Sequence, residues 1–81
     1  MEHTFSAHAV QRMIERRITP NEVNTVISSP DGTIIQSRDK TIFYKRLRHR
    51  KDNLIAVVAV GTPSETGWEV ITVLVNFEVR A

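Results

Sequence analysis

His8, Arg12 and Glu15 follow one another at spacings of four and three residues within the segment 5–17. On a helix, this spacing lines up an imidazole, a guanidinium and a carboxylate on one face. Imidazoles exchange protons near neutral pH, and a guanidinium pairs with a phosphate through two hydrogen bonds. RNA cleavage needs both groups, because the 2′-hydroxyl must lose a proton and the phosphorane charge must be stabilised. The spacing fits that chemistry, and it fits an ordinary solvated helix face equally well.

A second group of useful side chains lies on a predicted strand over residues 41–48. Its predicted nucleic-acid-binding residues are Tyr44, Lys45, Arg46 and Arg48. Alternation along a strand places Tyr44, Arg46 and Arg48 on one face and Lys45 on the other. An aromatic ring beside two guanidiniums suits the stacking of a base and the binding of its phosphates. A charged edge strand that resists aggregation has the same composition, so both interpretations stay open at this point.

Charge is distributed unevenly along the chain, although the net charge is only +2. Residues 1–51 carry ten Lys or Arg against five Asp or Glu, whereas residues 52–81 carry one against four. Seven of the cations fall between Arg38 and Lys51. Such a cluster attracts phosphate groups over long range, so RNA is a predicted partner.

The composition argues against several other classes of site. The chain has no cysteine, which rules out disulfides and thiolate metal sites. There is no His-x-x-x-His pair, no carboxylate cluster and no phosphate-binding glycine pattern, so we expect no metal and no cofactor. No apolar run approaches the roughly 20 residues of a membrane span, and no signal-peptide pattern opens the sequence. We therefore expect a soluble, cytoplasmic protein that does not enter a membrane.

Two short helices are predicted in the N-terminal part of the chain. In the first, Ala9, Val10, Met13 and Ile14 form an apolar face opposite His8. The second begins with Thr-Pro-Asn-Glu at residues 19–22, which is a capping box with proline at the first helical position. The first helix must end by residue 18, because a new cap begins at residue 19.

Beyond Gly32 the apolar pattern changes to the two-residue period of strands. The predicted strands cover residues 33–37, 41–48, 54–60 and 68 to about 79, with a flexible loop over 61–67. Strand 54–60 is almost continuously apolar, which indicates a central strand buried on both faces. The short connections favour an antiparallel meander. The predicted fold class is α+β: one domain, residues 1–81, in which two N-terminal helices cover one face of a four-stranded antiparallel sheet.

Alternation along the last strand predicts what each face of the sheet carries. One face would carry Ile71, Val73, Val75, Phe77 and Val79, and the other Trp68, Val70, Thr72, Leu74 and Asn76. The second of these faces is a mixed surface that no predicted helix covers, and it would be a concave binding face, a contact between copies or a partly exposed apolar patch. A domain this small has a thin core, so a homo-oligomer is a further expectation.

The sequence resembles a small bacterial domain family of unassigned function. That family carries Ser-x-His-Ala-x-x-Arg-Met-x-x-Arg, then Ile-Thr/Ser-x-x-Glu-Val, an Asn/Ser-Pro-Asp stop and a closing strand of the type Val-Ile-Thr-Val. The matching positions here are Ser6, His8, Ala9, Arg12, Met13, Arg16, Ile18, Thr19, Glu22, Val23, Pro30, Asp31 and residues 70–73. At one position the chain departs from the pattern, since Arg17 stands where relatives tend to have glycine.

The family is more remotely similar to the RelE/BrnT-like ribonuclease toxins, whose fold packs N-terminal helices on an antiparallel sheet. This resemblance implies a RelE-like, toxin-type protein acting on RNA, with a protein partner such as an antitoxin. It singles out His8, Arg12 and Thr72 as catalytic residues of a metal-independent endoribonuclease. The alternative is a non-catalytic module that binds nucleic acid or protein. Convergence of His8 and Arg12 with Tyr44, Arg46 or Thr72 on one concave surface would favour the enzyme.

Overall fold

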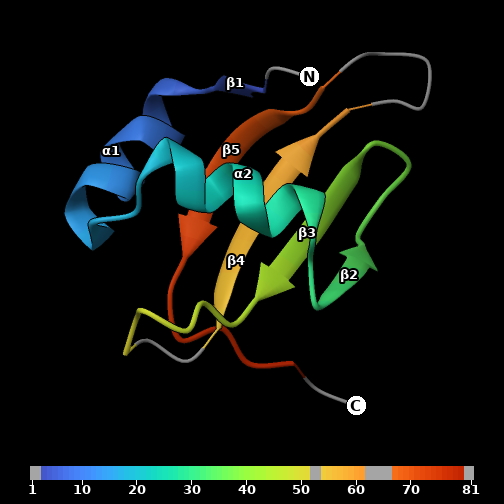
Figure 1. Ribbon diagram of the computed structural model, residues 1–81. Coiled ribbons are helices and arrows are strands. Elements are labelled where there is room, and N and C mark those ends of the chain that lie inside the picture. The colour runs from blue at the N-terminus through green and yellow to red at the C-terminus, as the bar shows by residue number, and fades with distance from the viewer. Residues whose placement is uncertain (1–2, 52–53, 62–66, 80–81) are drawn as a thin grey trace.

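A computed structural model describes residues 3–51, 54–61 and 67–79 of the chain. Two helices lie on one side of a five-stranded sheet (Figure 1). In chain order the elements are β1 (Thr4–Phe5), α1 (Ala7–Arg16), α2 (Pro20–Ser28), β2 (Gly32–Ile35), β3 (Lys40–Lys45), β4 (Ile55–Val60) and β5 (Glu69–Leu74). The fold is α+β, as the sequence predicts. Most of the predicted loop over 61–67 lies outside the described residues.

The two helices begin at caps that the sequence specifies. The Ser6 hydroxyl accepts a hydrogen bond from the Ala9 N–H at the start of α1. At the start of α2, the Thr19 hydroxyl accepts from the Glu22 N–H, and the Glu22 carboxylate accepts from the Thr19 N–H. This reciprocal arrangement confirms the predicted capping box. It also fixes the Glu22 side chain at the junction of the two helices.

The end of α1 shows why glycine is favoured at position 17, where this chain has arginine. Arg17 has φ 54°, in the left-handed region, and the Ile18 N–H donates to the Met13 carbonyl at 2.8 Å. This is a Schellman-type ending, in which the left-handed position is usually glycine because a Cβ is strained there. The side chains of Met13 and Ile18 are both buried, which supplies the apolar contact that accompanies such an ending.

Arg17→Gly is therefore expected to stabilise the fold by about 1 kcal/mol, because glycine adopts the left-handed conformation without strain. In a chain of this size, that gain raises Tm by roughly 4–8 °C in a thermal melt followed by circular dichroism. The same substitution at exposed Gln11, in the middle of α1, should lower stability by about 1 kcal/mol. A loss at both positions would show that the Arg17 backbone carries no strain.

The sheet has the order β1-β5-β4-β3-β2. Strands β2 to β5 form the predicted antiparallel meander. The prediction of four strands is wrong in one respect, because β1 adds a fifth strand that pairs in parallel with β5. Its two residues carry no readable alternation and lie directly before the cap at Ser6. Backbone hydrogen bonds from the N–H groups of Thr4 and Ser6 to the carbonyls of Trp68 and Val70 hold it.

A bulge in β5 changes the predicted division of that strand between the two faces. Val70 pairs with Ala59 and Thr72 pairs with Val58, so Ile71 is an extra residue in β5. As a result, Val70 and Val73 both point into the core beneath the helices, although simple alternation assigns them to opposite faces. The strand also ends at Leu74 rather than near residue 79, and Asn76 has φ 54° just beyond it. The predicted division of β5 by alternation is therefore wrong.

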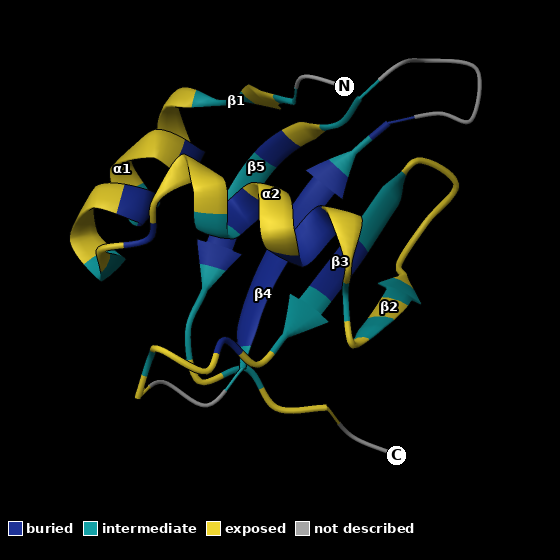
Figure 2. Cartoon of the chain, in the orientation of Figure 1, coloured by how far each residue is buried: buried dark blue, intermediate teal, exposed yellow. Residues whose placement is uncertain are grey.

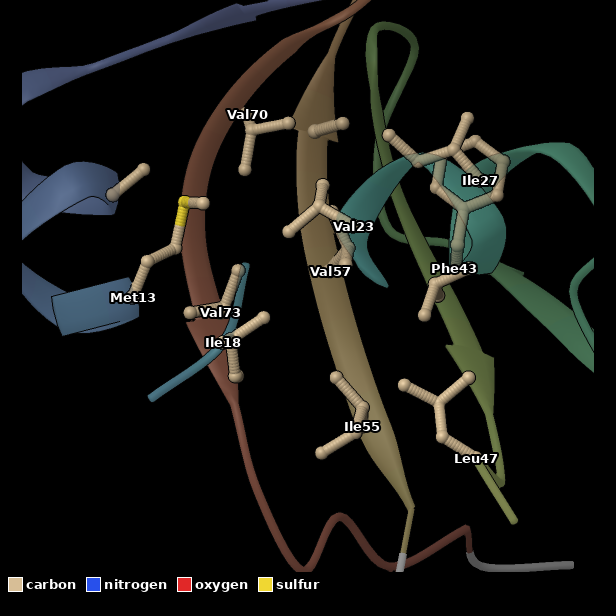
Figure 3. Close-up of a cluster of buried hydrophobic side chains, with 13 residues drawn as sticks. Met13, Ile18, Val23, Ile27, Phe43, Leu47, Ile55, Val57, Val70 and Val73 are labelled. Carbon is tan, nitrogen blue, oxygen red and sulfur yellow. The ribbon is translucent and has the colours of Figure 1, made fainter. Parts of the chain in front are cut away.

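The main core lies between the helices and the sheet (Figure 3). It includes Met13 and Ile18 at the end of α1, Val23 and Ile27 of α2, and Ile55 of β4. Strand β4 is buried from Ile55 to Ala59 and is dark blue over that stretch in Figure 2, in agreement with the prediction of a central strand buried on both faces. The helices thus cover one face of the sheet, as expected.

The sheet face away from the helices is here called the open sheet face. It carries a smaller apolar cluster made up of Ile34, Ile42, Tyr44, Ala56, Val58, Ile71, Leu74 and Phe77. Ile42, Ala56 and Val58 are buried there without a helix above them, while the others are half-buried. This face is more apolar than the mixed surface that the sequence predicts.

Candidate nucleic-acid interface

The predicted row on α1 faces solvent. His8 lies in the first turn of the helix and is exposed. Arg12 donates from Nη1 to Oε1 of Glu15 at 2.7 Å, one turn further along. That hydrogen bond is the main reason why the pKa of Glu15 lies below its ordinary value. The Arg12 guanidinium therefore already has a carboxylate partner, and the two groups form an ordinary surface ion pair.

Thr72 lies on the other side of the sheet from this row. It pairs with Val58, which belongs to the open sheet face, whereas α1 packs on the face that carries Val70 and Val73. Paired residues on neighbouring strands point to the same face. The structure therefore does not bring Thr72 together with His8 and Arg12, and the three residues share no concave surface. Their catalytic role stays a prediction.

Tyr44 lies on the open sheet face, on the side of β3 opposite Phe43. Its ring packs against Phe77 with the ring centroids 6.0 Å apart. The ring also covers Gly32, where a Cβ atom would come within 2.1 Å of the Tyr44 oxygen, so any larger residue there would displace the Tyr44 ring. Tyr44 is thus half-buried by its neighbours, which leaves only part of the ring for a base to stack on.

The predicted basic strand ends earlier than expected. Strand β3 stops at Lys45, so Arg46 and Arg48 follow it in a loop and do not share a strand face with Tyr44. Lys45 Nζ lies 3.5 Å from Oδ1 of Asp31, and the Arg46 N–H donates to Oδ2 of the same carboxylate at 2.9 Å. Chiefly because of the bond from the Arg46 N–H, the pKa of Asp31 lies below its ordinary value. Asp31 therefore fixes the start of the basic loop.

A β-turn holds the next part of this loop against the helices. The Arg50 N–H donates to the Leu47 carbonyl at 3.1 Å, which sets Arg48 and His49 at the two central positions of the turn. Leu47 is buried in the main core. The turn is therefore anchored on its first residue, while Arg48 and His49 stay exposed.

Arg50 anchors the other end of the turn. Its guanidinium donates to the backbone carbonyl of Arg17 at 2.8 Å and to that of Arg16 at 3.0 Å. Nη1 also lies 3.4 Å from both carboxylate oxygens of Glu22. Arg50 thus joins the basic loop to the carbonyls that end α1 and to the cap of α2. Sequence reasoning missed this contact, because its partners are 28 to 34 residues away in the chain.

The junction collects cations from separate parts of the chain at one end of the molecule. This basic end comprises Arg16, Arg17, Arg46, Arg48, Arg50 and Lys51. Arg17, Arg48 and Lys51 are exposed, and within the described residues their side chains form no ion pair. The predicted cluster from Arg38 to Lys51 is thereby divided, because Arg38 lies in the β2–β3 connection at the opposite end of β3 (Figure 1).

A protein-family model matches residues 5–75, which include both helices, strands β2 to β5 and the whole basic end. The chain belongs to the DUF4258 family. This family is described as a domain of unknown function. No curated protein and no solved structure matches the chain.

A second surface of this DUF4258 domain is apolar. Only part of the apolar face of α1 packs against the core, because Val10 is 43% exposed and Ile14 is 72% exposed. These two side chains line a groove of about 430 Å³ together with Phe5, Met13, Arg17, Ile18, Thr19 and Pro20. The sequence pattern identifies the stripe on α1 but not how much of it the sheet would cover.

The described part of the DUF4258 domain contains no group of three His, Cys, Asp or Glu placed to hold a metal ion. None of its described helices is long and apolar enough to cross a lipid bilayer.

Proposed function

We propose that the chain acts on RNA as a RelE-like, toxin-type protein and binds the RNA backbone through the basic end. The observation that carries this proposal is a set of three exposed cations around an anchored turn, Arg17, Arg48 and Lys51, whose side chains form no ion pair with any other described residue. Arg50 and Glu22 neutralise each other beneath them, so they leave the outer charges available. A phosphate backbone supplies the matching negative charges.

The anchoring of the turn favours a role of its cations in RNA binding over a role in preventing aggregation. Side chains on an anchored turn lose less conformational freedom on binding than side chains on a mobile loop. Leu47 and Arg50 fix both ends of this turn, and Asp31 holds the residues before it. The backbone of the turn that carries Arg48 is therefore held in one place at the basic end.

The test is the affinity for a fluorescent single-stranded RNA, measured by anisotropy from 50 to 300 mM salt. Three phosphate contacts predict a slope of about −2 in a plot of log affinity against log salt. Arg48→Ala combined with Lys51→Ala should lower the affinity about tenfold or more and reduce the slope by about 1.4. Arg38→Ala is the matched control, because it removes one exposed cation from the other end of β3 and should change neither value.

Affinity that does not fall with salt would contradict the proposal. A loss in log affinity for Arg38→Ala of half that of the double variant or more would also contradict it, because the loss per cation would then be the same at both ends and net charge alone would attract the RNA.

A protein partner, such as an antitoxin, is the second candidate, and a second copy of the chain also stays a prediction. The groove beside Val10 and Ile14 supports a contact with a protein partner or with a second copy, because exposed apolar surface of this kind marks contact sites. It lies beside Arg17, so a partner there would adjoin the basic end.

A further inference from the structure

His49 and Glu22 form a dyad at the edge of the basic end. Nε2 of His49 lies 2.6 Å from Oε2 of Glu22, across 27 residues of sequence. The Glu22 side chain is only 12% exposed, whereas that of His49 is 65% exposed. The dyad thus combines a sheltered carboxylate with an imidazole that solvent and ligands can reach.

The carboxylate is held in place by groups other than His49. The Thr19 N–H donates to Oε1 at 2.8 Å, and Arg50 lies beside both oxygens. Burial alone would raise the pKa of Glu22, but the hydrogen bonds from Thr19 and His49 and the charge of Arg50 outweigh it and hold the pKa below its ordinary value. Glu22 is therefore ionised at neutral pH and accepts a hydrogen bond from the imidazole.

This acceptor decides which imidazole nitrogen is basic. A carboxylate only accepts hydrogen bonds, so in the neutral ring the proton is on Nε2 and the lone pair is on Nδ1. Within the described residues, Nδ1 has no protein hydrogen bond. The β-turn carries His49 next to Arg48, and Lys51 follows two residues later. His49 is therefore flanked along the chain by exposed cations, which attract phosphates.

We propose that His49, oriented by Glu22, is the general base of an RNA-cleaving site at the basic end. This proposal rests on the proposed RNA binding and adds a reaction to it. A carboxylate that fixes the tautomer of an exposed imidazole is the arrangement that general bases use in other folds. It differs from the site predicted from the sequence, which uses His8, Arg12 and Thr72.

The reaction balances without any further reagent. Nδ1 of His49 removes the proton from a 2′-hydroxyl, and the 2′-oxygen forms a bond to the adjacent phosphorus. The bond from phosphorus to the 5′-oxygen breaks, and the leaving oxygen takes a proton from water. The resulting hydroxide takes the proton from the imidazolium, so the base is restored. The products are a 2′,3′-cyclic phosphate and a 5′-hydroxyl, and Arg48 and Lys51 are placed to offset the phosphorane charge.

The test measures binding and cleavage of one labelled single-stranded RNA in parallel, in buffer with EDTA. His49→Ala should lower the cleavage rate by about 10²- to 10⁴-fold. Its Kd should change less than about threefold, because the phosphate-binding cations remain. Glu22→Gln keeps an acceptor for the Thr19 N–H but removes the charge behind the imidazole, so it should lower the rate with little change in Kd. Gln36→Ala, an exposed substitution away from the basic end, should change neither value.

Two further measurements separate a chemical role from a structural one. A matched RNA with 2′-deoxyribose at the cleaved position should bind normally and stay intact, because it has no nucleophile. The rate of the wild type should rise with pH as imidazole loses its proton, and this rise should be missing from the residual rate of His49→Ala.

Binding without cleavage by the wild type, or full cleavage by His49→Ala, would overturn the dyad and leave the proposed RNA binding intact. A larger loss in His8→Ala than in His49→Ala would also overturn it. Absence of salt-dependent binding would overturn both proposals.

Discussion

Replacing Ile55 with alanine is expected to lower the free energy of unfolding by about 3 kcal/mol and Tm by roughly 15 °C. Ile55 is fully buried in β4 and belongs to the main core between the helices and the sheet, together with Ile18, Leu47 and Val73. Truncation removes apolar contact and leaves a cavity that the strand pairing on both sides keeps from closing. A domain of this size has only a few kcal/mol to lose, so a large unfolded fraction at 37 °C should follow.

Ile35→Ala is the matched control. Ile35 ends β2 and is 77% exposed, so the same truncation should change stability by less than about 0.5 kcal/mol. Chemical denaturation of both variants measures the difference. Similar losses at the two positions would contradict the assignment of the core to the helix side of β4.

The second large effect is expected at Arg50. Arg50→Ala removes the donor that satisfies the last carbonyls of α1 and leaves the sheltered Glu22 carboxylate without its cation. We expect a loss of about 2–3 kcal/mol at pH 7. Arg48→Ala, two residues away on the exposed tip of the same turn, should cost less than about 0.5 kcal/mol.

The stability difference between wild type and Arg50→Ala should also depend on pH. The folded pKa of Glu22 lies below its ordinary value of 4.5, so its contribution is present above that pH and is lost as the pH falls through the folded pKa. Urea unfolding at pH 7 and pH 3 should therefore show a smaller difference at pH 3. An equal difference at both values would mean that Arg50 acts through the α1 carbonyls alone.

Local signals in the sequence predict the helices and the order of the meander. The capping box at Thr19 and Glu22 requires only neighbouring residues, and so does the apolar run of β4. The left-handed conformation of Arg17 at the end of α1 was not predicted, because arginine gives no local signal for it.

Features that depend on distant contacts were not predictable in this way. Strand β1 exists because β5 offers it an edge, and the bulge at Ile71 depends on pairing with β4. Glu22 has a complete local explanation as a cap, so nothing in the sequence indicates that it also binds His49 and Arg50. The sequence shows that cations are concentrated in this part of the chain. Their arrangement at the basic end depends on the packing of the turn against the junction of the two helices.

The most direct test of RNA binding at the basic end is an NMR titration of the ¹⁵N-labelled chain with a short single-stranded RNA. Binding at the basic end predicts amide shift changes at Arg17 and Ile18 and across Arg48 to Lys51, and their loss when Arg48 and Lys51 are both replaced by alanine. Changes confined to the open sheet face around Tyr44 and Phe77, or to the β2–β3 connection around Arg38, would contradict it.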